Sequence, residues 1–394
     1  MKRAAAVLAV VMVLFAGYIA AVSALLSVDK ARTRAISQLS AWSGRVVTAG
    51  EEAELELFPS PSLILSDLHV SGPSGGRDNE IVVAERVRAD IRLVPLLIGR
   101  ISLGTLRLDN AEIRLLRDSE GLRNWQFDSA PAAVQLALTG DLPFDRFVLN
   151  NARITYDNRK RGESETAEVS SLELNWADIR EPATLSATVI ARGETVAFRA
   201  RLRNAPAFFD GKVTSFSAEL TSDMLNARFN GELADYKAFR FSGQLDASGP
   251  SLRRIISFAG GPRTTGPGLG PIAISGHTEL KPERFFVDRG SLQLDDNSAT
   301  GTLSVSIPVD GGKPKLTGTL AFSAMDITPY LHALGGADDV TWRERRIDTD
   351  WFDNFDADVR ISAEQIVAGR YTFGSTAASA FMTNRLLEIG LAQA

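Results

Sequence analysis

Most of this chain is patterned with a period of two. In Gly301–Ile307 the odd positions after Gly301 are Leu, Val and Ile, whereas the even positions are Thr or Ser. Similar alternation runs through Leu225–Leu233, Phe241–Ser248 and several earlier segments. Strict alternation of apolar and polar residues is typical of β-strands with one buried face. The pattern therefore predicts a mainly β protein whose strands share an apolar face.

Short polar segments between the alternating runs predict the turns of an antiparallel sheet. Asn, Asp, Gly and Pro favour tight turns because they tolerate or impose unusual backbone angles. We expect each of these segments to connect two short strands. They are Gly72-Pro73, Asp109-Asn110, Asn150-Asn151, Asp157-Asn158 and Asp295-Asp296-Asn297.

Helical patterns are few, and two of them belong to an internal repeat. One helix is expected at about Asp29–Trp42. Phe241–Gly261 aligns without a gap on Leu316–Gly336, and each segment reads as a strand followed by a short amphipathic helix and a Gly-Gly pair. Phe355–Ser362 resembles the start of a third such strand. A repeated strand-plus-helix unit favours an elongated body.

The N-terminus carries a segment long enough to cross a membrane. Residues 4–26 contain no charged side chain, and Lys2 and Arg3 precede them. At about 1.5 Å per residue, this segment spans a hydrocarbon core roughly 30 Å thick. Val22-Ser23-Ala24 is a weak cleavage pattern, so a removed signal peptide is the alternative to an anchor. We expect an anchor, with the body of the chain outside the cytoplasm.

Charge and residue content argue against several functions. The net charge is -5 and the sequence pI is about 5.5, whereas nucleic-acid binding normally needs a basic surface. The 394 residues include no cysteine, and the three histidines, His69, His277 and His332, lie far apart. The G-x-S-x-G pattern at residues 72–76 precedes a strand pattern rather than a helix. We expect no enzyme activity, cofactor or metal.

A set of specific short motifs follows Val94. Pro95-Leu96-Leu97 and Gly99 are followed by Asp118-x-x-Gly121-x-x-Asn124-Trp125. Together with the N-terminal anchor and Pro59-Ser60-Pro61, these motifs resemble the N-terminal signature of the AsmA family. The resemblance is strong through about Phe127 and continues as a strand pattern to the end. Asn124-Trp125 is read as a structural turn and plug, with a partner or lipid-headgroup contact as the alternative.

The resemblance implies a fold and a role. AsmA-like proteins are similar to TamB and to chorein-type bridge proteins, which implies a long antiparallel sheet curled into a gutter that holds lipid acyl chains. It also implies an inner-membrane anchor, a periplasmic body and links to outer-membrane assembly and phospholipid traffic. We divide the chain into an anchor (1–27), an AsmA-like N-terminal region (28–130) and a β-repeat body (131–394) with a joint near 260–271. Because family members usually continue beyond the position of Ala394, we expect a truncated or short member with an open sheet edge.

Two functions fit these features of the sequence. The first is the binding or conduction of phospholipid along an apolar β-groove. The second is a sandwich-like periplasmic scaffold that assists outer-membrane protein assembly and holds no lipid, because a two-sheet sandwich would bury the same side chains. For the groove, the expected lining residues are Leu225, Phe229, Phe241, Leu245, Leu292, Leu294, Leu303, Val305, Leu320 and Phe322.

Overall fold

The protein is mainly β, as the alternation predicts, and it divides into two compact units. Unit 1 is Met1–Phe209 and unit 2 is Asp210–Ala394. The domain boundaries expected from sequence stay predictions. The structure is a computed structural model that describes residues 28–58, 60–72, 80–92, 95, 102–125, 144–160, 162–235, 239–261, 266–306, 312–333, 355–383 and 386–393.

The predicted membrane anchor at residues 4–26 lies outside the described residues. Within the part of the chain that the structure describes, no helix has the length and apolar character needed to cross a membrane. The helix expected at Asp29–Trp42 is confirmed, since α2 spans Val28–Ser43.

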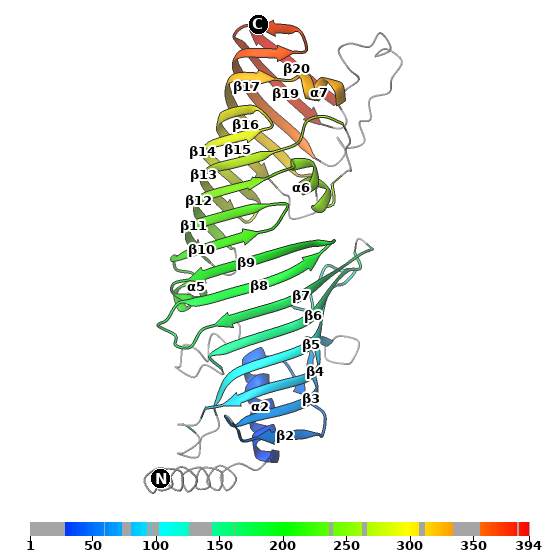
Figure 1. The fold of residues 1–394 in the computed structure, drawn as a ribbon, viewed down its shortest axis with the longest axis vertical. Helices are drawn as coiled ribbons and strands as arrows, with labels where there is room; N and C mark the ends of the chain where they lie inside the picture. Colours follow the sequence, from blue (N-terminus) through cyan, green and yellow to red (C-terminus); the bar gives the residue numbers. More distant parts are fainter. Residues whose placement is uncertain are drawn as a thin grey trace, which may run out of the picture. The chain divides into compact units, whose positions relative to one another are not determined.

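Unit 1 combines α2 with a sheet of long strands (Figure 1). The strands are β1 (Val47–Thr48), β2 (Ala53–Glu56), β3 (Ser62–Ser71), β4 (Glu80–Ile91), β5 (Leu103–Arg117), β6 (Arg146–Asn158), β7 (Glu163–Asn175), β8 (Ala183–Ala191) and β9 (Glu194–Leu202), and the short helix α5 (Ala205–Phe209) follows. From β3 to β9, strands that are consecutive in sequence pair with each other, while β1 and β2 both pair with β3.

The pairing of unit 1 departs from the expected antiparallel sheet at one place. β5 and β6 run parallel, with Leu108 beside Leu149. A parallel neighbour needs a crossover connection of a dozen or more residues, and the chain between these strands runs from residue 118 to residue 145. An alternation of period two marks strands equally well in either orientation, so this crossover could not be read from the pattern.

Several strands of unit 1 are kinked at a residue with positive φ. These residues are Asp67 in β3 (49°), Asn110 in β5 (54°) and Asn151 in β6 (51°). Asn and Asp adopt this left-handed conformation more readily than other non-glycine residues. The kink shifts the alternation by one place, so Leu108 and Ala111 both lie buried although they are three residues apart.

Two of the turns expected from sequence are wrong, because the chain continues through them as a strand. Asp109-Asn110 and Asn150-Asn151 lie inside β5 and β6, and the Nδ2 atom of Asn150 donates a 2.8 Å hydrogen bond to Oδ1 of Asp109. The left-handed tolerance that favours Asn in a turn here bends a continuing strand. The expected turn at Asp295–Asn297 is confirmed. The turn expected at Asp157-Asn158 lies directly after these two residues, which end β6, and Gly72-Pro73 falls partly outside the described residues.

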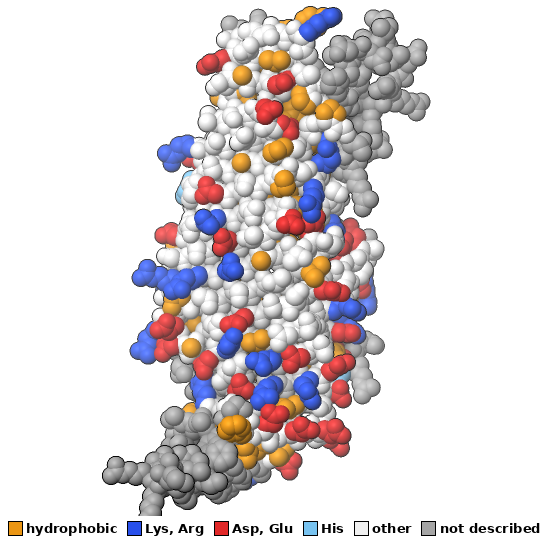
Figure 2. Space-filling model, in the orientation of Figure 1, with side chains coloured by type: hydrophobic (Ala, Val, Ile, Leu, Met, Phe, Trp, Pro, Cys, Tyr) orange, Lys and Arg blue, Asp and Glu red, His pale blue; other side chains and the backbone are white. Residues whose placement is uncertain are grey.

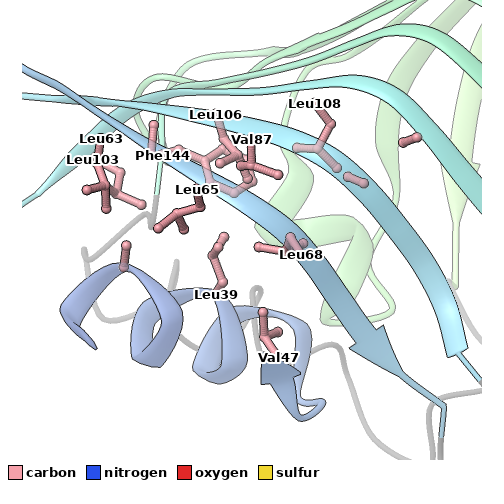
Figure 3. Close-up of a cluster of buried hydrophobic side chains, with 14 of the residues drawn as sticks. Leu39, Val47, Leu63, Leu65, Leu68, Val87, Leu103, Leu106, Leu108 and Phe144 are labelled. Carbon is pink, nitrogen blue, oxygen red and sulfur yellow. The ribbon is translucent and has the colours of Figure 1, made fainter. Parts of the chain in front are cut away.

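The core of unit 1 lies between α2 and the apolar face of the sheet (Figure 3). Ala31, Ala35 and Leu39 recur every four residues, so they form one buried stripe on the helix. Leu63 and Leu65 of β3 are fully buried beneath it, and each such leucine contributes roughly 2 kcal/mol on burial. The helix therefore covers the apolar face of the first strands of unit 1.

Unit 2 consists of further paired strands, with short helices at the ends of some of them (Figure 1). Its elements are β10 (Thr214–Thr221), β11 (Asn226–Ala234), β12 (Arg240–Gly249), α6 (Leu252–Phe258), β13 (Ile272–Lys281), β14 (Arg284–Leu294), β15 (Asn297–Ser306), β16 (Lys315–Asp326), α7 (Thr328–Ala333), β17 (Asp356–Ala368), β18 (Tyr371–Phe373), β19 (Thr376–Thr383) and β20 (Leu386–Gln393).

Consecutive strands of unit 2 pair antiparallel from β10 to β16, and β17 then lies parallel to β16. β17 pairs with β18 along one half and with β19 along the other, and β19 pairs with β20. The strand-plus-helix part of the predicted repeat is confirmed as β12 with α6 and β16 with α7, whereas the second Gly-Gly pair, Gly335-Gly336, lies outside the described residues. Equivalent residues cap both helices: Ser251 Oγ accepts from Arg254 N, and Asp326 Oδ1 accepts from Thr328 N.

Glycines lie at neighbouring positions across the sheet of unit 2. Gly231 and Gly243 face each other across β11 and β12, and a Cβ added to Gly243 would lie 2.5 Å from the Cα of Gly231. Register shifts occur beside Gly276 in β13 and Gly290 in β14. Glycines and bulges let a sheet curve strongly because no side chain occupies the inside of the bend. We call this line the glycine crease.

Candidate functional site

The strand register places an apolar surface on one side of unit 2, and we call it the apolar face. It is formed by alternate residues of β10–β20, so each member lies beside a member on the next strand. One row across the strands is Leu220, Ala227, Ala247, Ile274, Leu292, Ala299, Phe322 and Ala363. Another row is Leu233, Phe241, Leu280, Phe285, Val305, Leu316, Ala357, Met382 and Leu387.

The strand register places nine of the ten expected lining residues on the apolar face. They are Phe229, Phe241, Leu245, Leu292, Leu294, Leu303, Val305, Leu320 and Phe322. Leu225 is the exception, because it precedes β11 in a turn where its N–H donates to Ser222 Oγ at 2.9 Å. Their contact with lipid stays a prediction.

The apolar face is packed in one region and open in another. Phe216, Phe229, Phe241 and Phe285 follow one another across β10–β14 with ring centroids 6.0, 4.9 and 6.4 Å apart. Phe229 and Leu320 are each only 8% exposed, whereas Ile389 and Leu391 on β20 are 65% and 66% exposed. Apolar side chains therefore become accessible toward β20.

The opposite side of the sheet is polar. A depression of about 510 Å³ lies over β10–β14. It is lined by two mostly polar rows and by Leu220, Ala227, Ala247 and Ile274 of the row between them. One row holds Glu219, Arg228 and Asp246, with an Arg228–Glu219 ion pair at 2.9 Å. The face of the molecule in Figure 2 carries acidic and basic side chains interspersed, with hydrophobic ones scattered among them.

The motif residues of unit 1 form a turn at the end of β5. Asn124 is buried, and its side chain accepts from Leu116 N at 2.9 Å and donates to Arg114 O at 2.8 Å. Asp118 Oδ1 accepts from Leu122 N at 2.8 Å. These bonds close the turn as an Asx-type cap. Gly121 has a φ of 92°, which suits glycine.

The rest of the motif is described only in part. The Trp125 ring packs edge-on against Tyr156, with centroids 5.9 Å apart, and Arg123 lies over it. Pro95 is described, but Leu96 and Leu97 lie outside the described residues. The contacts of Asn124 and Trp125 are contacts with the chain itself, which fits the structural interpretation of this motif.

The titratable groups of the described residues form small, separate networks. Asp295 accepts from Leu269 N, Gly270 N and the Tyr330 hydroxyl at 3.0, 2.7 and 2.5 Å. Partial burial and the Asp295 carboxylate raise the pKa of Tyr330. His69 Nδ1 lies 3.0 Å from Glu80, and His277 bonds Ser242. Among the residues that the structure describes, no group of three His, Cys, Asp or Glu is placed to hold a metal.

Sequence reasoning missed the glycine crease and the kinks of unit 1. A signal for the kinks was present: apolar residues are spaced two, three and two apart in Leu106–Ile113 and again in Phe147–Ile154. The crease had a weaker signal, because a single glycine in a strand pattern indicates a bulge or a close backbone approach without identifying the strand that approaches.

Comparison with known families gives one match. The model of the family described as the AsmA family matches residues 1–255, which include all of unit 1 and β10–β12 of unit 2. No curated protein matches the sequence.

Proposed function

This chain belongs to the AsmA family, and from that premise we propose that it serves envelope biogenesis by binding phospholipid acyl chains on the apolar face of unit 2. We further propose that residues 4–26 anchor it in the inner membrane, so that the β-sheets lie in the periplasm. The binding of acyl chains is non-covalent, so the proposed function needs no catalytic residue or cofactor.

The observation that carries the proposal is a contrast between the two units. In unit 1 the apolar face of the first strands is covered by α2, whose Ala35 and Leu39 are buried against it. In unit 2, α6 and α7 lie at the ends of the strands from which they emerge (Figure 1). Within the described residues, the apolar face of unit 2 therefore has no comparable helix lying across it.

The chemistry of the apolar face suits acyl chains. Most of its residues are aliphatic or aromatic, apart from the glycines of the crease and Thr278, and a buried methylene contributes about 0.8 kcal/mol. Repetition along the strands offers similar surroundings at each step, so a chain can shift without meeting one deep minimum. A phospholipid headgroup would remain in water beside the apolar face, because that face offers the headgroup no charged partner.

The test compares two substitutions in one strand. Val305 lies on the apolar face of β15, and Thr300 lies exposed on the opposite face of the same strand. We would purify the full chain with Val305→Asp or Thr300→Asp from membranes, extract its lipids and weigh the intact protein by native mass spectrometry. Because both variants keep the same N-terminal segment, lipid held there cancels in the comparison.

The proposal predicts that wild type and Thr300→Asp retain near-stoichiometric phospholipid and that Val305→Asp loses most of it while its circular dichroism stays unchanged. A buried carboxylate in an apolar site is unfavourable, so an acyl chain would be excluded. If all three proteins carry equal lipid, or if well-folded wild type carries none, acyl binding at this face is wrong and a lipid-free scaffold for outer-membrane protein assembly becomes the better explanation.

A further inference from the structure

Two polar side chains of unit 1 meet at the ends of the parallel strands β5 and β6. Arg117 and Asn158 are neighbours in the register, and Arg159 N donates to Arg117 O at 2.9 Å. The Nε atom of Arg117 and the Oδ1 atom of Asn158 are buried, and neither has a hydrogen-bond partner among the described residues. Buried polar atoms nearly always have a partner, so a donor and an acceptor that both lack one indicate a ligand or a water at this place.

Both residues lie on the side of the sheet that carries the core of unit 1. Beyond the kinks, every second residue of β5 and β6 points to that side, and Ile113 and Ile154 pack against the core. Arg117 and Asn158 follow on the same side of their strands, and Asn158 is only 3% exposed. The apolar surface of these two strands therefore ends in a guanidinium and an amide.

Arg117 has no counter-charge within the described part of the chain. Its acidic neighbours have other partners, since Asp118 accepts from a backbone N–H of its own turn and Asp157 lies 3.7 Å from Arg159. The guanidinium of Arg117 lies against Gly121, where an added Cβ would be 3.6 Å from Nη2. A half-buried guanidinium without a carboxylate partner is suited to bind an anion from outside the chain.

We propose that Arg117 and Asn158 bind a phosphate group that has a hydrogen-bond donor beside it, as phosphoethanolamine has. The guanidinium fork matches the geometry of phosphate oxygens, and Asn158 Oδ1 accepts from the neighbouring ammonium or hydroxyl group. Glu163, which is exposed opposite Asn158 on β7, supplies a carboxylate near an ammonium group. That this phosphate belongs to a phospholipid headgroup rests on the proposed function, whereas the phosphate site itself does not.

The competing explanation is a bond inside the protein. A rotation of either side chain would let Arg117 Nε donate to Asn158 Oδ1, and the two unpaired atoms would then satisfy each other. That pairing leaves no need for a ligand. Direct binding measurements separate the two explanations, because only the proposed site takes up phosphate.

Two water-soluble probes test the site in the full chain. Inorganic phosphate and glycerophosphoethanolamine, which has no acyl chain, would each be added to protein purified in a maltoside detergent and followed by phosphorus NMR line broadening. Arg117→Gln should weaken the binding of both probes by about ten-fold or more, because it removes a charged hydrogen-bond donor. Arg114→Gln is the matched control, because Arg114 is exposed on the opposite side of β5 and pairs with Glu112, so its affinity should equal that of wild type.

A second variant supplies the missing counter-charge from within. Asn158→Asp keeps the shape of the side chain and places a carboxylate beside Arg117, so both probes should lose their binding while the circular dichroism stays unchanged. Stronger binding of glycerophosphoethanolamine than of phosphate would assign the site to a lipid headgroup, and the reverse order would assign it to free phosphate.

The proposal is overturned if wild type binds neither probe, or if Arg117→Gln and Arg114→Gln bind them equally. Because neither probe carries an acyl chain, these results are independent of the lipid that Val305→Asp retains. The phosphate site and the acyl-chain proposal can therefore fail separately.

Discussion

Gly231 and Gly243 lie directly opposite each other in β11 and β12, with backbones so close that neither position has room for a methyl group. A Cβ on Gly231 would lie 2.6 Å from the Cα of Gly243 and 2.9 Å from the ring of Phe229. These contacts are with backbone and a packed aromatic ring, so a methyl group fits only if the two strands move apart. Glycine at both positions is therefore a steric requirement of this close approach.

Gly243→Ala should destabilise unit 2 by about 1–3 kcal/mol, the usual cost of overpacking a site that cannot relax freely. Gly374→Ala is the matched control, because the space around Gly374 is open and its φ is not in the left-handed region. Urea unfolding of both variants measures the difference. Equal midpoints for the two variants would show that the sheet opens at the crease without cost.

A substitution at Asn110 can test the positive φ alone, because the side chain makes no buried packing contacts that the substitution would remove. The side chain is exposed on β5 and the φ is 54°. A β-branched residue is strongly disfavoured in this conformation, so Asn110→Val should cost about 1–2 kcal/mol. Asn110→Gly should be close to neutral, since glycine adopts this conformation readily.

Thermal unfolding of the two Asn110 variants provides the measurement, with Glu112→Val as the control at an exposed position of the same strand that has no positive φ. Valine favours strands, so Glu112→Val should not lower the melting temperature appreciably. If Asn110→Val is as stable as Glu112→Val, the kink does not depend on the left-handed conformation.

The strands and their apolar face could be predicted from sequence because alternation reports directly on which side chains share a face. The alternation places Phe229, Leu245 and Leu303 on one surface, and the register agrees. The repeat with its two capped helices was visible for a similar reason, since helix caps use a small set of residues.

Curvature and strand order could not be predicted in the same way. Asn110 and Asn151 carry turn chemistry, and only the apolar residues on both sides of each reveal that the strand continues. The parallel pairing of β16 and β17 depends on contacts between residues distant in sequence, and no local pattern encodes them. The position of α2 over the sheet of unit 1 likewise depends on the packing of Leu39 against distant strands. The helical period of α2 predicts a buried stripe, but it does not predict which surface that stripe contacts.

Asp295 should be a stability determinant of unit 2. Its carboxylate accepts hydrogen bonds from two backbone N–H groups before β13 and from Tyr330 on α7, so it joins three segments. Loss of a charged acceptor leaves its donors unpaired, which costs about 1–3 kcal/mol. Asp295→Ala should therefore lower the free energy of unfolding by about that amount.

The neighbouring Asp296 is exposed and provides the control for this prediction. Asp296→Ala removes the same charge from the same turn and should change stability by less than about 0.5 kcal/mol. Guanidinium unfolding followed by tryptophan fluorescence and by circular dichroism gives both values. Similar losses in the two variants would mean that the charge of the turn matters and the three hydrogen bonds do not.

Arg32 holds α2 against the sheet of unit 1, and its removal should loosen the cover over that apolar face. Its guanidinium donates to Gly50 O at 2.8 and 3.1 Å and to Ala49 O at 2.9 Å. Arg32→Ala should raise amide hydrogen exchange in α2 by about ten-fold or more, because charged hydrogen bonds contribute about 1.5–3 kcal/mol. Arg34→Ala, at an exposed position of the same helix, should leave exchange nearly unchanged. If exchange in α2 is equal in the two variants, apolar packing through Ala31, Ala35 and Leu39 is sufficient to keep this face covered.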